Sequence, residues 1–531
     1  MVGKAKDIPD FDKEIINDKL KKHRYEDVKY VHYVKDLIFN DCVKDAMQEL
    51  EKEFKKDGNR HYPRLLLLGI VLFCFMRGMY KYREIELACR ESRFLRILTG
   101  GAEPCKNTFR NFLNQSDTEE MRKVFLFTLL RYNELDLLKF LHYFIDSTSA
   151  VVRGSKYFKI YKVELEAMKL MKELGLLHNG KPKRMKDTAR KLIKMKNDLE
   201  NKHEIIEFID LILPKLQIYS HKMYKRIDEF EQAMENSNKE FVCITYPTAP
   251  LIKTKKGNWD FAKNLQKAIT DNNIIIGSIF INDPDDSKAL PQLIPELNKN
   301  FEILKDLIVQ YGNRRNYTEI SKMLDLAMAV CDSGYSTEEN ITYVVENNIR
   351  ALIMPKIIAT FINNELRKYE DNLEVLSEDK VIEEVFNGKK DMKRIWNGYT
   401  CKFNRSVMYA GCKPILEEKA KGLPYKATKA RFNYKAVNCK GCPYIKDCKY
   451  KSFSENISPY IFESMNKFTQ KFYQELYMLR LQKAESIFGY SKGIKGILHL
   501  LGTNDKAITN EMFLRDASYN TIHFENIKYT A

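Results

Sequence analysis

Three acidic residues occupy positions from which a carboxylate could bind a metal ion. Asp146 follows the apolar run LHYFI, Asp332 follows LAMAVC, and Glu485 lies in the helical pattern YMLRLQKAESIFGYSKG. An acid at the carboxyl end of a strand, where a sheet opens to solvent, is well placed for chemistry. Carboxylate oxygens suit Mg²⁺ or Mn²⁺, and two such ions about 4 Å apart can activate a hydroxyl nucleophile and stabilise the leaving oxygen in phosphodiester cleavage. An Asp after a strand can equally begin a turn or cap a helix.

Glu485 is the single acid in its basic helical stretch. The apolar stripe of that helix consists of Tyr477, Leu481, Ala484 and Phe488, and Glu485 falls on or beside it. A carboxylate there would be partly buried, which is costly unless another group pairs with it. Two interpretations stay open from the residues alone: a Glu whose head reaches water or pairs with a nearby Arg or Lys, and a metal-binding or catalytic carboxylate.

The segments around these acids alternate between strand and helix patterns. A helix is expected over about 286–309, and Thr337 or Ser336 can cap another that follows Asp332. This alternation predicts an α/β layer with a mixed sheet. The expected strands are 141–152, 241–247, 274–283, the run that ends in Asp332, and 350–355.

The chain divides into six segments by pattern. The stretch IKTKKGNWDFAKNLQKAIT is read as basic and turn-rich, and the part that holds the cysteine cluster is read as less regular. The segments are 1–135, helical, for DNA binding or dimerisation; 136–155, the first part of a catalytic core; 156–240, a helical insertion; 241–356, the second part of the core; 357–465, a cysteine-containing insertion; and 466–531, the helix with Glu485 and a C-terminal tail.

Charge and hydropathy narrow the classes of function. The 531 residues include 89 Lys and Arg against 72 Asp and Glu, a net charge of +17 that favours a polyanionic partner, with nucleic acid ahead of membrane. The longest apolar run, Leu65–Met76, is too short to span a bilayer and predicts a buried helix. The N-terminus lacks the apolar core of a signal peptide, so a cytoplasmic protein is expected. No P-loop or GxGxxG occurs, which argues against nucleotide hydrolysis.

A helix-turn-helix pattern lies in the N-terminal segment. The stretch RILTGGAEPCKNTFRNFLNQ contains a Gly-Gly turn and a new helix that begins at Asn107 or Thr108. Arg110 in this second helix makes the pattern compatible with docking on DNA. Plain packing of helices against each other explains the pattern equally well.

Eleven cysteines, an odd number, argue for reduced thiols or metal ligands rather than disulfides. Cys439, Cys442 and Cys448 are spaced C-x2-C-x5-C, and Cys401 or Cys412 upstream offers a fourth thiolate. A CxxC with a Gly between its cysteines makes a tight knuckle, and four thiolates would close a tetrahedral structural zinc site. Unliganded reduced cysteines are the alternative, and an iron–sulfur cluster is less favoured.

Several of these segments together resemble the DDE transposases of bacterial insertion sequences, in the correct order along most of the chain. The N-terminal helical domain of that family resembles YPRLLLLGIVLFCFMRGMYKYREIELACRESRFLRILTGG followed by TFRNF. IDSTS stands where relatives commonly read DGT, a departure of one residue, and CDSGYSTEEN resembles DAGY or DRGY followed by a helix. LIKTKKG and NLQKAI resemble the segment before the second strand.

The resemblance implies a role for each residue of the helix near the C-terminus. Tyr477, Arg480, Glu485 and Lys492 supply the Tyr-Arg-Glu-Lys signature, with four residues between Arg and Glu where the family more often has three. Asp146, Asp332 and Glu485 would then be the catalytic triad of a ribonuclease H-like fold and bind two Mg²⁺ or Mn²⁺. Tyr477 and Arg480 would position DNA, and Lys492 would contact a phosphate. The family pattern Tyr-x-Cys also favours Cys401 as the fourth zinc ligand.

The expected function is therefore that of a DNA transposase. By resemblance, it binds the terminal inverted repeats of its own element as a homodimer, cuts to free a 3′ hydroxyl, and joins that hydroxyl to target DNA. It would act in the bacterial cytoplasm, associated with the nucleoid. The alternatives are a transposase-derived DNA-binding protein that no longer catalyses, and a metal-dependent nuclease that cuts without joining.

Overall fold

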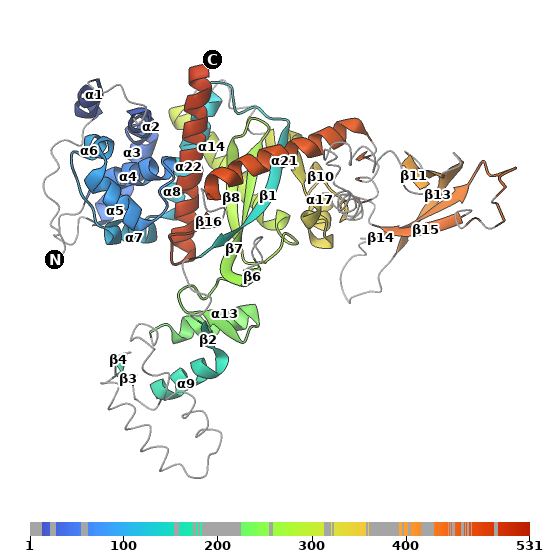
Figure 1. Cartoon of the computed structure of the whole chain (residues 1–531), viewed down its shortest axis with the longest axis horizontal. Coiled ribbons are helices and arrows are strands. Elements are labelled where there is room, and N and C mark those ends of the chain that lie inside the picture. The colour runs from blue at the N-terminus through green and yellow to red at the C-terminus, as the bar shows by residue number, and fades with distance from the viewer. Residues whose placement is uncertain are drawn as a thin grey trace, which may run out of the picture.

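We describe the fold from a computed structural model of the whole chain. The described residues are 13–21, 28–54, 62–152, 159–173, 177–178, 181–182, 225–253, 259–312, 320, 323–356, 359, 392–395, 398–401, 405–415, 429–443, 445–446, 448, 452–457, 461, 464, 467–468, 470–492 and 498–530. Helices lie at one end of the molecule, a sheet flanked by helices lies in the middle, and a second sheet lies at the other end (Figure 1).

The N-terminal part is helical, as its periodicity predicts. The apolar run that is too short for a membrane forms α4, which is buried along almost its whole length. No helix in the described part of the chain is long and apolar enough to cross a membrane. The helices are α1 (Lys13–Lys21), α2 (Val28–Ile38), α3 (Asp41–Phe54), α4 (Arg64–Met76), α5 (Tyr82–Glu91), α6 (Arg93–Thr99), α7 (Lys106–Gln115) and α8 (Thr118–Glu134).

A mixed sheet forms the centre of the molecule, and the expected α/β class is confirmed. β1 runs parallel to β9 and β16 and antiparallel to β7, which is itself antiparallel to β8 and β6, while β10 runs parallel to β9. The strands are β1 (His142–Val151), β6 (Leu251–Lys253), β7 (Trp259–Thr270), β8 (Ile275–Ile281), β9 (Met328–Cys331), β10 (Ala351–Ile353) and β16 (Leu498–His499).

Helices cover both faces of this sheet. α21 (Lys471–Lys492) packs Leu476 against Phe144 of β1 and Val330 of β9. α22 (Asp505–Thr530) packs on the same face of the sheet as α21. Lys267 of β7 lies opposite Asp146 of β1, so both side chains point to that face, and Lys267 forms an ion pair with Asp516 of α22. α14 (Leu290–Tyr311) covers the opposite face, and α17 (Glu338–Glu346) follows β9.

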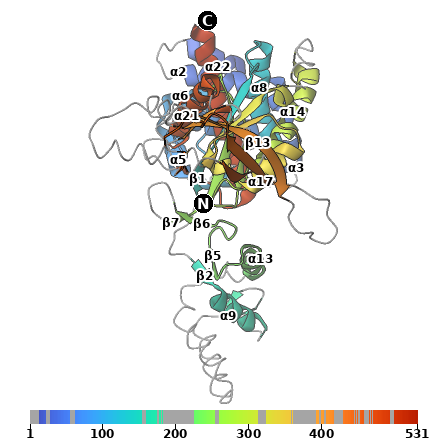
Figure 2. The ribbon, with the colours of Figure 1, turned by 90° about the vertical axis from the view of Figure 1, so that its right-hand side faces the viewer.

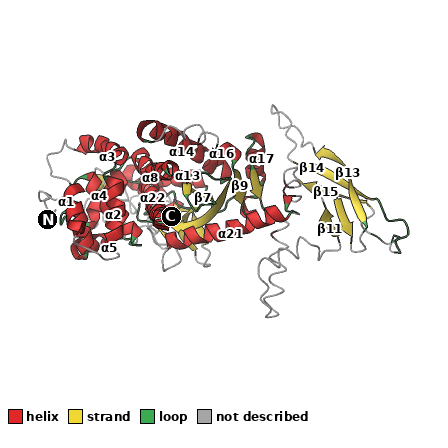
Figure 3. Cartoon of the chain, turned by 90° about the horizontal axis from the view of Figure 1, so that it is seen from above, coloured by secondary structure: helices red, strands yellow, loops and turns green. Residues whose placement is uncertain are grey.

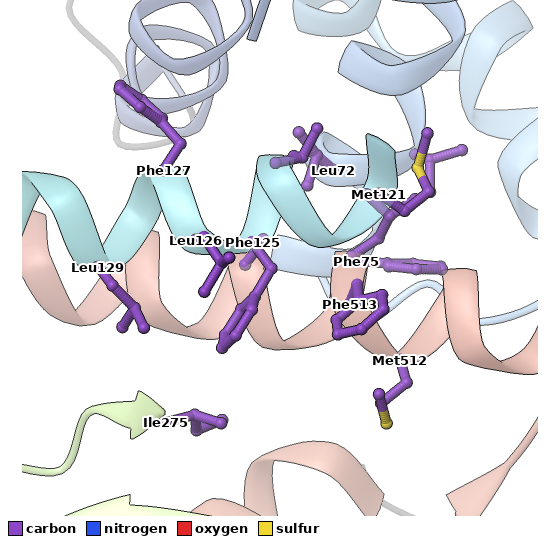
Figure 4. Close-up of a cluster of buried hydrophobic side chains, with 14 of the residues drawn as sticks. Leu72, Phe75, Met121, Phe125, Leu126, Phe127, Leu129, Ile275, Met512 and Phe513 are labelled. Atoms are coloured by element: carbon purple, nitrogen blue, oxygen red, sulfur yellow. The ribbon is translucent and has the colours of Figure 1, made fainter. Parts of the chain in front are cut away.

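α22 joins the helical part to the sheet through one apolar core. Phe125 of α8 and Phe513 of α22 stack with ring centroids 5.9 Å apart. Figure 4 shows these rings between α8 and α22, with Leu72 and Phe75 of the N-terminal helices and Ile275 of β8 in the same cluster. Because one continuous core spans helices and sheet, the two parts are held in a fixed relation.

Two further groups of elements project from the central body. The first group hangs below the sheet and contains β2 (Lys159–Tyr161), α9 (Lys162–Glu173), β3 (Leu177–His178), β4 (Lys181–Pro182), α13 (Ile227–Ser237) and β5 (Phe241–Cys243) (Figure 2). The second is an antiparallel sheet far from the N-terminal helices, made of β11 (Met392–Ile395), β12 (Gly398–Cys401), β13 (Ser406–Ile415), β14 (Lys429–Ala436) and β15 (Ser452–Ile457) (Figure 3).

Most expected elements around the acids are present. β1, β8 and β10 fall within three of the predicted strands, β9 precedes Asp332, and α14 covers most of the helix expected over 286–309. The side chain of Thr337 accepts a hydrogen bond from the Asn340 backbone amide, so Thr337 rather than Ser336 caps α17. The strand expected over 241–247 is only the short β5, which pairs with β2 outside the central sheet.

Three predictions about elements are wrong. The stretch read as basic and turn-rich forms the β6–β7 hairpin, and β7 lies between β1 and β8. The part of 357–465 read as less regular holds the five strands β11–β15. The C-terminal tail contains the long buried helix α22. β7 and α22 were missed because buried polar side chains, which bond to each other, interrupt their apolar patterns.

Candidate active site

Asp146 and Asp332 lie at the same level of two neighbouring parallel strands. The register pairs Ile145 of β1 with Cys331 of β9, and each aspartate is the next residue. Asp146 is not at the end of its strand as expected, because β1 continues to Val151 along β7. β9 does end at Cys331, so the two acids still meet where the parallel pairing stops. Neighbouring strands are about 4.8 Å apart, which brings the two side chains within reach of one cation.

Arg480 of α21 joins the two aspartates. Its Nη2 lies 2.9 Å from Asp146 Oδ1 and 3.2 Å from Asp332 Oδ2, and its side chain is only 4% exposed. Burial alone would lower the pKa of Arg480, but the two carboxylates outweigh burial and raise that pKa above its usual range. Arg480 is therefore a permanent cation between two acids. Direct contact with DNA, which the resemblance implies, would require it to leave this position.

Backbone amides fix the orientation of both carboxylates. Ser147 N lies 2.9 Å from Asp146 Oδ1, and Gly334 N lies 2.7 Å from Asp332 Oδ1. Asp332 thereby caps the short turn η3 (Ser333–Tyr335) that leads into α17. These hydrogen bonds fix the direction in which each carboxylate points. The pair is preorganised to receive a cation.

The remaining residues of the expected signature lie on the same helix. Tyr477 is partly buried, and its ring meets Phe468 edge-on at 5.7 Å and lies 5.7 Å from the Arg480 guanidinium carbon. Glu485 and Lys492 both belong to α21, but their side chains fall outside the described residues. Glu485 follows Arg480 by five residues, which is about 7.5 Å along a helix axis. Glu485 is thus carried by the same helix as the arginine that joins the two aspartates.

The two aspartates offer two of the oxygen donors that a divalent cation takes. The guanidinium of Arg480 already lies between two carboxylate oxygens, one from each strand, at ion-pair distance. Among the described side chains, no three His, Cys, Asp or Glu are arranged to hold a metal ion as they stand. The expected third ligand, Glu485, is outside that set. Oxygen donors of this kind are those that Mg²⁺ and Mn²⁺ take in proteins.

Sequence reasoning missed a third carboxylate beside this pair. A side chain built on Gly334 would begin 2.9 Å from Asp332 Oδ1 and 3.1 Å from Asp286 Oδ2, so the two acids flank the same glycine. Asp286 comes from the loop between β8 and α14. The signal in the sequence is INDPDD, a run of acids directly after the clearest strand of the chain.

Arg110, the residue expected to contact DNA, lies on α7 among the N-terminal helices. It is exposed, as are Lys106, Asn107 and Asn111 on the same helix, whereas Phe109 faces the core. α7 begins at Lys106, one residue before the expected start. Basic and amide side chains on one exposed helix face are the types that contact phosphates and base edges.

The cysteine cluster lies at one end of the β11–β15 sheet. Cys442 N donates to Cys439 O at 3.1 Å, and Gly441 between them has a φ of 80°, so the CxxC forms the expected tight knuckle. Burial and the neighbouring Cys401, Cys442 and Cys448 raise the pKa of Cys439. Cys401, at the end of β12, is therefore close enough to Cys439 to affect its charge, although the four described thiols are not arranged to hold a metal ion as they stand. Cys412 lies in β13, but its side chain is outside the described residues.

Comparison of the chain with models of known families and with curated proteins finds no match.

Proposed function

We propose that this protein is a DDE-type DNA transposase that cuts and joins DNA with two bound Mg²⁺ or Mn²⁺. The observation that carries the proposal is the meeting of Asp146 and Asp332 at one level of two parallel strands, around a buried cation from α21. The same helix holds Glu485. Such a site requires acids from two strands and one helix, and we propose that the Glu485 carboxylate completes the pair.

The topology supports a ribonuclease H-like core for this activity. β1, β7 and β8 follow one another as antiparallel neighbours, and β9 and β10 add on the other side of β1, parallel to it. α14 and α17 connect the later strands, and α21 returns across the sheet with its acid. The long insertion between β10 and α21 contains the cysteine cluster, for which we propose one structural Zn²⁺ held by Cys401, Cys439, Cys442 and Cys448.

The chain's own side chains would bind and orient the reacting groups. Asp146, Asp332 and Glu485 would hold the two metal ions, which when bound activate a hydroxyl nucleophile and stabilise the leaving oxygen. The amides of Ser147 and Gly334 hold the two aspartate side chains in place. Arg480 offsets part of their charge, which keeps the carboxylates close together before cations and DNA arrive.

The DNA partner follows from charge. The net charge of +17 supplies salt-dependent attraction to phosphates, and the exposed face of α7 with Arg110 is the best candidate for reading the terminal repeat. Tyr477 and Lys492 on α21 would position the DNA end beside the acids. We propose a homodimer, in which each copy binds one end of the element, acting on DNA in the bacterial cytoplasm.

One observation favours a second candidate, a transposase-derived protein that binds DNA without cutting it. Arg480 already pairs with both aspartates, so it offsets one of their two negative charges. A protein that had lost catalysis could keep such an ion pair for stability alone. In the transposase, divalent cations would displace or share the contact of Arg480 with the two aspartates. In the protein that only binds DNA, they would not.

Cleavage of a labelled duplex that carries the repeats flanking the gene tests the proposal. Wild type and Asp146→Asn are compared in Mg²⁺ and in Mn²⁺, with Asp285→Asn, an exposed acid, as the matched control. We expect wild type and the control to cut at the repeat end and Asp146→Asn to bind without cutting. Joining of the cut end to a plasmid separates a transposase from a plain nuclease. Binding by all three without cutting in either metal would leave the DNA-binding candidate.

A further inference from the structure

Asp286 holds its negative charge with neutral partners alone. Asn264 Nδ2 and Gln266 Nε2 donate to its Oδ1 at 2.9 and 2.7 Å, and Ser147 Oγ donates to its Oδ2 at 2.9 Å. Within the described residues, no Lys, Arg or His lies within ion-pair distance of this carboxylate, although the other partly buried acids around it pair with Arg480. Three neutral donors bind the carboxylate without cancelling its charge.

The donors come from β1, the strand that carries Asp146, and from its neighbour β7. Ser147 is the residue after Asp146 in β1, and its side chain points to the opposite face of the sheet because neighbours in a strand alternate. Gln266 of β7 pairs with Ser147 across the ladder, and Asn264 lies two residues away on the same face. Asp286 therefore lies on the face of the sheet opposite to the face that carries the Asp146 side chain.

The loop of Asp286 is also bonded to the turn of Asp332. Asn340 Nδ2 donates to the Asp286 carbonyl oxygen at 2.8 Å, and Thr337 Oγ1 donates to the Ser287 carbonyl oxygen at 2.6 Å. Burial, followed by Asp286 and Asp146, raises the pKa of Tyr335 well above its usual range, so its hydroxyl stays protonated and donates to Gln266 Oε1. One network thus links both aspartates to Asp286.

We propose that Asp286 is a positioning residue for divalent cations at the candidate active site. It orders β1 beside Asp146 and the turn at Asp332, and its uncancelled charge adds to the negative potential there. The inference rests on the proposed function, because it assigns a role at the same site. Groups that support metal ligands in this way typically change metal affinity or activity by about 10–100-fold when they are replaced.

The test compares Asp286→Asn with Asp285→Asn, an exposed neighbour in the same loop. Asp286→Asn keeps the size of the side chain but removes the charge. Two quantities are measured for each protein: the Mn²⁺ concentration that gives half-maximal DNA cleavage, and the increase in melting temperature caused by Mn²⁺ without DNA. We expect Asp286→Asn to require about 10–100-fold more Mn²⁺ than the wild type, both for half-maximal cleavage and for the same increase in melting temperature. Asp285→Asn should match the wild type.

A second variant separates charge from geometry. Ser147→Ala removes one donor to Asp286 but keeps the carboxylate, so its Mn²⁺ requirement should rise less than that of Asp286→Asn. A merely structural Asp286 would lower the melting temperature in the absence of metal and leave the Mn²⁺ requirement unchanged, and this result would overturn the inference. An Asp286→Asn variant that responds to Mn²⁺ like the wild type would also overturn the inference. If the wild type still cuts DNA in that case, the proposed function stands. A wild type that neither cuts nor gains stability from Mn²⁺ would overturn both.

Discussion

Arg480 sets the balance of charge among the acids of the candidate site. Asp146, Asp286 and Asp332 contribute three carboxylates, and the described cation among them is one guanidinium. The excess of negative charge favours binding of further cations, while the guanidinium occupies the space between two of the ligands. Metal ions and Arg480 therefore interact with the same oxygens, and binding of one alters binding of the other.

Replacement of Arg480 by Met tests this competition. Without the guanidinium, Asp146 and Asp332 face each other as like charges, so we expect the metal-free protein to lose about 1–3 kcal/mol of stability. Mn²⁺ should then raise the melting temperature of Arg480→Met more than that of the wild type. The control is Arg90→Met, which removes an exposed partner of Glu86. An equal Mn²⁺ response in wild type and Arg480→Met would show that metals do not approach these oxygens.

At the scale of elements, α7 is the helix for which we propose a DNA-reading role. Its buried side is fixed by Phe109 and Phe112, and Asn510 of α22 donates to the Leu113 and Ser116 carbonyl oxygens at 2.9 Å each. The helix is thus attached both to its neighbours and to the long helix that packs on the sheet. Its exposed side chains can contact DNA without any rearrangement of the core.

Arg110→Ala should weaken binding to the terminal repeat by about 1–3 kcal/mol if Arg110 contacts a base edge. If Arg110 contacts a phosphate instead, binding should weaken equally for all sequences, and the salt dependence should fall by about one charge. Titrations of specific and scrambled duplexes at several salt concentrations distinguish these results. Arg90→Ala is the control in the same group of helices, since its charge pairs with Glu86. Equal affinity of Arg110→Ala and the control would remove α7 from the interface.

The cysteine knuckle predicts a zinc-dependent module. Purified protein should contain one zinc per chain, and Cys442→Ser should lose it and melt earlier, whereas the exposed Cys105→Ser should not. The raised pKa of Cys439 means that the thiol is protonated at neutral pH, so metal binding must release this proton and should weaken as pH falls. Metal analysis of protein dialysed at pH 8 and pH 5 measures this. Zinc retained by Cys442→Ser would contradict the assignment.

At the scale of the whole molecule, two ion pairs connect α22 to the sheet, and the pair of Lys267 with Asp516 is fully buried. Lys267 of β7 pairs with Asp516, their side chains are 2% and 1% exposed, and Ser278 Oγ donates to Asp516 Oδ2 at 2.6 Å. Asp505, at the start of the helix, receives hydrogen bonds from Tyr246 and Lys263. These contacts specify where the helix docks, because a buried charge is costly in any position without its partner.

Lys267→Met should destabilise the protein by about 3–5 kcal/mol, because it leaves the buried Asp516 carboxylate without a cation. The double variant Lys267→Met with Asp516→Asn should recover most of this loss, since the charge is removed and an acceptor for Ser278 is kept. Melting temperatures of the three proteins measure the effect. Lys81→Met, which removes an exposed partner of Glu84, should change little. A double variant as unstable as Lys267→Met would contradict this explanation.

The sequence allowed prediction of those parts of the fold in which apolar runs end in turn residues. β1, β8 and the unit of β9, turn and α17 have this form, and they carry Asp146 and Asp332. β7 could not be predicted, because Asn264, Gln266 and Lys267 are buried only by virtue of partners far away in the chain. Arg480 shows the same limit, since its ion pairs with two strands form only when α21 packs on the sheet. Asp286 belongs to no motif, and its three neutral donors come together only in the fold.

The most direct test of the central claim is the role of Glu485 in DNA cleavage. Glu485→Gln is compared with Glu475→Gln, an exposed glutamate on the same helix that pairs with Lys471, for binding and cutting of the repeat-end duplex in Mn²⁺. We predict that Glu475→Gln cuts like the wild type, while Glu485→Gln binds the duplex with wild-type affinity and does not cut. Undiminished cutting by Glu485→Gln would contradict the claim that Asp146, Asp332 and Glu485 form one metal-dependent site.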